Sequence, residues 1–161
     1  MVAPTPKPIA VFHSTDDILR YAASREAAAV ELYTQLAAQC TQPIMRLTFL
    51  EFAAEEQAHQ MRLKELLAKG RPFLPTGKPV ESLGIARHLP EVKPSADLGL
   101  REALQLAMSE EKKAFLVYWK LAEATKDQAA LHQTFLGLAQ EEARHKLRFE
   151  LDYERLSFEK D

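Results

Sequence analysis

A single cysteine among 161 residues excludes an internal disulfide and any metal site built from cysteine pairs. That residue, Cys40, falls at the end of an expected helix and is interpreted as a bystander. Apolar runs are too short to cross a bilayer, and the formal net charge of −2 indicates neither a nucleic-acid nor a membrane partner. The N-terminal "MVAPTPKPIAVFHS" lacks the apolar core of a signal peptide. Together these absences favour a cytoplasmic protein.

No segment alternates in the manner of a β-strand, and helical periodicity dominates instead. The four expected helices cover about residues 16–39, 43–69, 98–124 and 127–156. Ser14 is suited to cap the N-terminus of the first helix, and Asp17, three residues further on, is placed as its capping partner. Five prolines in residues 70–97 exclude a long helix there and indicate a crossover. We therefore expect one domain over residues 1–161, an all-α four-helix bundle of two antiparallel hairpins joined by this crossover.

The two predicted hairpins share one sequence pattern. "EAAAVELYTQLA" from Glu26 returns 85 positions later as "EKKAFLVYWKLA" from Glu111. "FLEFAAEEQAHQMRL" from Phe49 returns 86 positions later as "FLGLAQEEARHKLRF" from Phe135. This internal repeat predicts a pseudo-twofold axis through the bundle.

Four glutamates fall in the middle of the apolar stripes, one on each expected helix. They are Glu26, Glu56, Glu111 and Glu142. Carboxylates facing one another in an apolar core repel, and burying them without a cation is costly. Two divalent metal ions would balance the four charges, and the imidazoles of His59 and His145, each three residues after a glutamate, would complete a nearly neutral site. The spacing therefore predicts a dinuclear metal centre.

Other polar residues near these motifs have simpler interpretations. Glu55, Glu110 and Glu141 are offset by about 100° from the glutamates that follow them and are expected on solvated flanks. His13, His88 and His132 lack a companion carboxylate at ligand spacing and are expected at the surface. Tyr33 and Tyr118 are either core residues or hydrogen-bond donors to the carboxylates.

These motifs resemble the ferritin-like superfamily, and within it the rubrerythrin-type domain, over about residues 14–156. The resemblance implies that Glu56 and Glu142 bridge the metals. It also implies that Glu26 and His59 complete one metal site, and that Glu111 and His145 complete the other. Two features depart from rubrerythrins: the cysteine pairs of a rubredoxin module are missing, and Met108 and Ala114 flank Glu111 where an additional carboxylate is common.

The resemblance implies two iron ions, with manganese or zinc as alternatives at the same site. We expect a redox enzyme that reduces hydrogen peroxide or O2 at a diferrous centre, with Tyr33 and Tyr118 steadying the carboxylates. Since the chain has no rubredoxin module, the electron donor would be external, such as a rubredoxin-like protein. A ferroxidase or iron-handling protein and a non-catalytic metal-stabilised bundle remain alternatives. The family resemblance further implies a homodimer.

Overall fold

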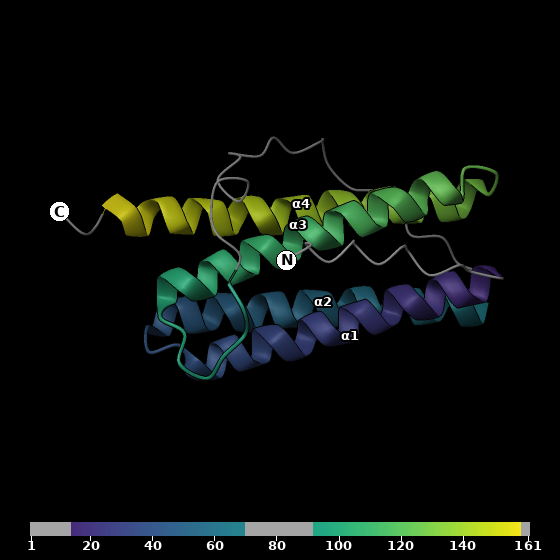
Figure 1. The fold of residues 1–161 in the computed structure, drawn as a ribbon. Coiled ribbons are helices and arrows are strands. Elements are labelled where there is room, and N and C mark those ends of the chain that lie inside the picture. Colours follow the sequence, from purple (N-terminus) through teal and green to yellow (C-terminus); the bar gives the residue numbers. More distant parts are fainter. Residues whose placement is uncertain (1–13, 70–91, 159–161) are drawn as a thin grey trace, which may run out of the picture.

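The computed structural model describes residues 14–69 and 92–158, which form four α-helices and, within these two ranges, no strand. The helices are α1 (Thr15–Gln39), α2 (Pro43–Lys69), α3 (Leu100–Ala124) and α4 (Ala129–Phe158). Two layers make up the bundle, one of α1 and α2 and one of α3 and α4 (Figure 1). The predicted all-α bundle of two helical hairpins is therefore confirmed. Most of the predicted crossover lies outside the described residues.

Local sequence accounts for the helix boundaries. The Ser14 side chain accepts a hydrogen bond from the Asp17 backbone N–H at 3.1 Å, which caps α1 as expected. The expected start of the third helix was two residues early, because Gly99 is extended and serves as the N-cap of α3. The fourth helix also begins two residues later than expected, since the Gln128 N–H closes a turn onto the Thr125 carbonyl at 2.9 Å.

The apolar core divides into two clusters along the bundle. One cluster includes Tyr33, Phe49 and Phe149, with Tyr33 stacked on Phe49 at 6.4 Å between ring centroids. The other cluster includes Tyr118 and Phe135, which stack at 6.2 Å. These two tyrosine–phenylalanine pairs occupy equivalent positions in the internal repeat.

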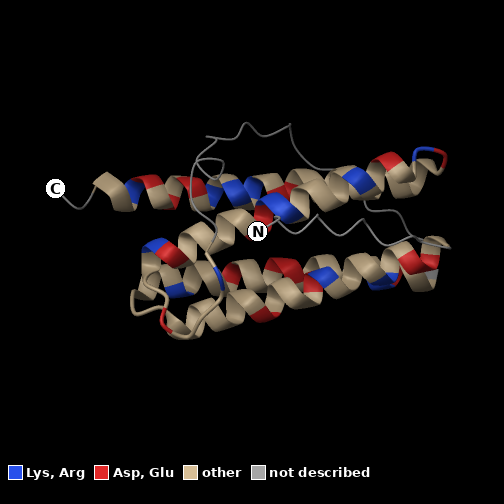
Figure 2. Cartoon of the chain, in the orientation of Figure 1, with Lys and Arg blue, Asp and Glu red and all other residues tan. Residues whose placement is uncertain are grey.

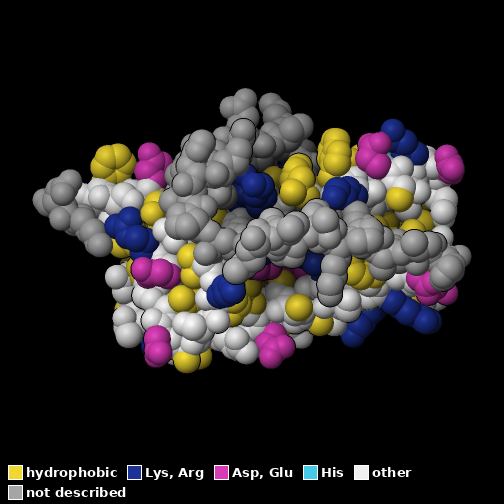
Figure 3. All heavy atoms as spheres, viewed as in Figure 1, with side chains coloured by type: hydrophobic (Ala, Val, Ile, Leu, Met, Phe, Trp, Pro, Cys, Tyr) yellow, Lys and Arg dark blue, Asp and Glu magenta, His cyan; other side chains and the backbone are white. Residues whose placement is uncertain are grey.

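Charged residues of both signs are interspersed along all four helices (Figure 2). The face in Figure 3 likewise mixes acidic, basic and hydrophobic side chains, without a region of one sign. Among the described helices, none combines the length and apolar character that a membrane span needs.

Candidate metal centre

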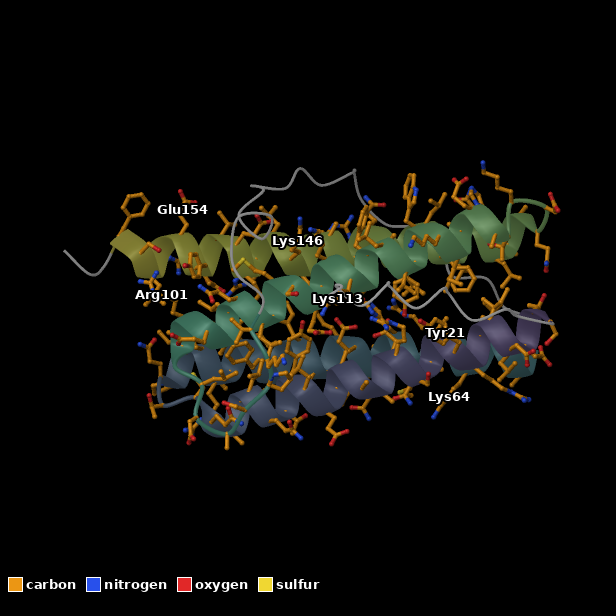
Figure 4. All side chains as sticks on the ribbon, viewed as in Figure 1. Tyr21, Lys64, Arg101, Lys113, Lys146 and Glu154 are labelled. Atoms are coloured by element: carbon orange, nitrogen blue, oxygen red, sulfur yellow. The ribbon has the colours of Figure 1, made fainter. Side chains whose placement is uncertain are left out.

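The four predicted glutamates converge from four different helices. Glu26 of α1, Glu56 of α2, Glu111 of α3 and Glu142 of α4 are each at most 3% exposed. The burial of each glutamate follows from its position on the buried stripe of its helix. In α1, for example, this stripe includes Leu19, Ala22, Ala23 and Glu26. Side chains of the α1–α2 layer and of the α3–α4 layer fill the space between the two layers (Figure 4).

Both predicted histidines turn Nδ1 toward this carboxylate cluster. His59 Nδ1 lies 3.6 Å from Glu26 Oε1, 3.2 Å from Glu56 Oε2 and 3.1 Å from Glu142 Oε1. His145 Nδ1 lies 2.7 Å from Glu56 Oε1, 3.5 Å from Glu111 Oε1 and 3.8 Å from Glu142 Oε2. The two imidazole rings are nearly parallel, with centroids 5.9 Å apart.

These contacts define two overlapping ligand sets. Their potential ligand atoms lie within 4.8 Å of one another in each set. One set is Glu26, Glu56, His59 and Glu142, and the other is Glu56, Glu111, Glu142 and His145. Glu56 and Glu142 belong to both sets. Each directs one carboxylate oxygen toward His59 and the other toward His145. The arrangement can therefore hold two cations with Glu56 and Glu142 between them.

The donor set fits metal ions better than it fits a metal-free core. Among the described residues, Glu111 Oε2 and Glu142 Oε1 are buried without a hydrogen bond, although His59 Nδ1 lies 3.1 Å from Glu142 Oε1. Buried polar atoms are usually satisfied, so two buried oxygens without a hydrogen bond in one cluster fit a bound cation as their partner. Carboxylate and imidazole ligands suit iron, manganese and zinc.

Burial and mutual repulsion shift the pKa values of the cluster. Burial, with the neighbouring Glu56, raises the pKa of Glu26 to about 8. Burial and the charges of Glu111, Glu56 and Glu26 also raise the pKa of Glu142. Burial opposes ionisation of Glu56 too, but hydrogen bonds from Glu26 and both histidines outweigh it and lower that pKa. Despite burial, the surrounding carboxylates raise the pKa values of His59 and His145.

Stability of the metal-free protein is expected to fall as pH rises from about 5 to 8. The folded protein binds the Glu26 proton more tightly than the unfolded chain, so its contribution is present below pH 4.5 and lost toward pH 8. The raised pKa values of Glu142 and the two histidines also make stability fall as the pH rises. The lowered pKa of Glu56 affects stability only below the ordinary pKa of a glutamate, where stability falls as the pH falls. Melting curves should show Tm falling by about 2–4 °C for each kcal/mol lost.

Metal ions replace these protons, so the difference in Tm between zinc-loaded and metal-free protein should widen over the same range. The Glu26→Gln variant should show a shallower pH dependence when it is metal-free. A metal-free Tm that stays level or rises from pH 5 to 8 would contradict this account of the cluster.

Both predicted tyrosines donate hydrogen bonds to the outer glutamates. Tyr33 of α1 donates to Glu111 Oε1 of α3, and Tyr118 of α3 donates to Glu26 Oε1 of α1. Burial, with the neighbouring carboxylates, raises the pKa of both phenols, so each remains a donor. Of the two interpretations open at the sequence level, these contacts favour the hydrogen-bonding one, although both rings also pack in the core.

Glu141 corrects an expectation from the sequence because it is largely buried, whereas Glu55 is exposed on its flank as expected. Each of the two also pairs with the outer nitrogen of a histidine on the opposite hairpin. Glu141 contacts His59 Nε2 and is 18% exposed, whereas Glu55 contacts His145 Nε2 and is 54% exposed. A carboxylate on the outer nitrogen fixes the imidazole tautomer and orientation, so that Nδ1 can bind a metal. The repetition of the Glu-Glu doublet in both halves was the signal available for this pair.

Removing the Glu141 carboxylate should weaken metal binding at His59. Glu141→Ala is expected to lower the affinity of that metal about 10–100-fold. Glu141→Gln, which retains a hydrogen-bond acceptor, should lower it less. Competition titrations with a fluorescent zinc chelator would measure both, with Glu154→Ala, exposed on the outer side of the same helix, as control (Figure 4). Equal affinities for wild type and Glu141→Ala would exclude this positioning role.

The two halves of the centre differ in their apolar surroundings. The Phe52 ring lies 4.6 Å from the His145 ring, whereas the residue equivalent to Phe52 in the other half of the repeat is Leu138. Phe149 packs edge-on against Phe52 at 4.5 Å, and its equivalent is Leu63. The metal site at His145 therefore has the more aromatic wall.

Three more histidines and Glu110 were expected at the surface, and the structure describes two of these four residues, His132 and Glu110. His132 is half-buried, and its Nδ1 lies 2.7 Å from the Ala122 carbonyl oxygen, so it ties α4 to the end of α3. His13 and His88 lie outside the described residues. Glu110 is 35% exposed and pairs with Lys113 at 3.5 Å, in keeping with a solvated flank.

Two cavities of about 430 Å³ each flank the centre. The first lies between α1 and α3 and reaches all four glutamates and both tyrosines of the centre. The second lies between α2 and α4, over His59 and His145, and three arginines contribute to its walls. Neither cavity was evident from helical periodicity.

Comparisons with known proteins agree with this geometry. The rubrerythrin family model matches residues 17–151. A crystal structure described as that of a ferritin-like diiron-carboxylate protein from Thermotoga maritima is similar, with a TM-score of 0.62 and 21% sequence identity. The similarity covers 86% of this chain and 93% of that one, and at this identity it shows the fold. A comparison with curated proteins found no match.

Proposed function

The chain belongs to the rubrerythrin family, and from that premise we propose that it is a redox enzyme that reduces hydrogen peroxide or O2 at a pair of iron ions. The observation that carries the proposal is the pair of overlapping ligand sets that share Glu56 and Glu142. Two metal ions held by common carboxylates can change oxidation state together. When bound, a diferrous pair supplies the two electrons that convert hydrogen peroxide to water.

Residues around the centre have distinct roles in this proposal. Glu26 and His59 complete one iron site, and Glu111 and His145 complete the other. Tyr118 and Tyr33 hold the outer carboxylates in place through hydrogen bonds. The two apolar clusters restrict water at either end, while the cavity between α1 and α3 admits the oxidant to the carboxylate side.

Electrons would come from a separate reductant, such as a rubredoxin-like protein, in a cytoplasmic setting. The single cysteine, Cys40, cannot form the cysteine pairs of a rubredoxin-type iron site, which supports a separate donor. A homodimer is proposed as the working assembly. Exposed hydrophobic side chains on α2 support it, namely Ile44, Leu47, Leu50 and Met61.

Anaerobic stopped-flow oxidation tests the proposed activity. The iron-loaded, reduced protein is mixed with hydrogen peroxide or O2, and absorbance of the oxidised pair is followed. We expect stoichiometric oxidation by peroxide, faster than by O2, and repeated turnover with an electron donor. A reduced protein that reacts with neither oxidant would overturn the proposal. Oxidation by O2 followed by iron release or mineral formation would instead indicate iron handling.

A further inference from the structure

We propose that the cavity between α1 and α3 binds the organic part of a hydroperoxide, R–OOH. Organic hydroperoxides, in addition to hydrogen peroxide, are then the substrate class of this centre. The inference rests on the proposed peroxide-reducing function and names its substrate.

The size of the cavity exceeds what hydrogen peroxide requires. Its volume is about 430 Å³, whereas one water molecule occupies about 30 Å³ in the liquid. Sites for small organic ligands range from about 300 to 1,000 Å³. The cavity is therefore large enough for an organic group as well as the reacting oxygens.

The walls of the cavity suit an apolar group. They include Ala28, Ala29 and Leu32 of α1 and Ala114 of α3; the polar components are Ser24, Arg25 and Glu110, together with the four glutamates and two tyrosines of the centre. Ala29 and Ala114 occupy equivalent positions in the internal repeat, each one turn after an outer glutamate. Because both side chains are small, the space next to Glu26 and Glu111 remains open.

The second cavity has a different chemical character. Its walls include Arg62, Arg144 and Arg148, together with the Glu55 and Glu141 carboxylates. It reaches the histidines rather than the four central glutamates. An apolar hydroperoxide is therefore expected to enter between α1 and α3, where all four carboxylates line the cavity.

The reaction balances with the electrons of the reduced metal pair. The O–O bond of R–OOH would break as a bound diferrous pair supplies two electrons and becomes diferric. Two protons taken up from the solvent would complete the products, R–OH and H2O.

Binding can be tested without redox chemistry. Zinc-loaded protein is titrated with 2-phenyl-2-propanol, the alcohol product of cumene hydroperoxide, by ligand-observed NMR. We expect saturable binding to wild type and at least about 10-fold weaker binding to Ala114→Leu, whose larger side chain occupies the part of the cavity next to Glu111. Ala27→Leu is the matched control, because Ala27 is exposed on α1 and does not line the cavity.

Reactivity is then compared in the same variants after iron loading and reduction. Ala114→Leu is expected to slow oxidation by cumene hydroperoxide at least about 10-fold more than it slows oxidation by hydrogen peroxide, because the smaller oxidant needs less of the cavity. The retained hydrogen peroxide reaction also shows that the variant is folded and loaded. Ala27→Leu should match wild type with both oxidants.

The outcomes separate this inference from the proposed function. Oxidation by hydrogen peroxide but not by cumene hydroperoxide, with no binding of the alcohol, overturns the inference alone. Equal effects of Ala114→Leu and Ala27→Leu on binding and on rate also overturn it. Indifference of the reduced protein to both hydroperoxides overturns the proposed function and the inference together.

Discussion

Replacing Glu142 with alanine is expected to deprive the bundle of both metal ions. The two Glu142 oxygens lie 3.1 Å from His59 Nδ1 and 3.8 Å from His145 Nδ1, so this carboxylate serves both ligand sets. Loss of a shared ligand should lower the metal affinity by more than the roughly 10–100-fold expected when a hydrogen-bond partner of a ligand, such as Glu141, is removed. Glu56→Ala should have the same effect for the same reason.

Outer glutamates should behave differently from the shared ones. Glu26 belongs to the His59 set and Glu111 to the His145 set. Glu26→Ala is therefore expected to retain one metal ion per chain. Metal analysis after anaerobic loading and desalting would distinguish two ions in wild type, one in Glu26→Ala and close to none in Glu142→Ala.

Glu154→Ala is the matched control, since Glu154 is an exposed glutamate of the same helix as Glu142. It should retain both ions. Circular dichroism of the metal-free variants would establish that their helices are intact. Full metal content in Glu142→Ala, with intact helices, would contradict the shared role of this residue.

Removal of the metal ions is expected to lower Tm by tens of degrees. Binding to the folded state alone stabilises it by about 4 kcal/mol for each site when the free metal is about 1,000-fold above Kd. Two sites would then contribute about 8 kcal/mol, and each kcal/mol corresponds to about 2–4 °C in a protein of this size. The shift is large because the buried carboxylates repel one another without cations.

Differential scanning calorimetry before and after chelation, and again after metal is restored, would measure this effect. Glu142→Ala should have nearly the same Tm with and without chelator. A wild-type Tm that chelation leaves unchanged would mean that the acidic core is stable without cations.

Helical phase was sufficient to predict the six candidate ligands. Glu56 lies on the buried stripe of α2, and Glu142 lies on the buried stripe of α4. The position of each along its own helix is enough to predict that it is buried. The internal repeat then indicated that equivalent residues would face one another. Tyr33 and Tyr118 followed from the same phase, but their hydrogen bonds depend on the distance between α1 and α3 and required the structure.

Residues that act between helices were harder to predict. A helical wheel places Glu55 and Glu141 beside the buried stripe, but it does not show that the histidine of the opposite hairpin lies within reach. Ala114 could be read only as a small residue in place of a carboxylate, whereas the structure places it in the wall of a cavity. Met108, the other departure from the family pattern, is fully buried in the apolar core.

Anomalous diffraction from crystals of the iron-loaded protein, collected at the iron absorption edge, tests the dinuclear centre most directly. The account predicts two peaks per chain, about 3.5–4 Å apart as in other two-metal sites, with Glu56 and Glu142 in contact with both. One peak should lie beside His59 Nδ1 and the other beside His145 Nδ1. The absence of any peak among the six side chains, or peaks only at the protein surface, would contradict it.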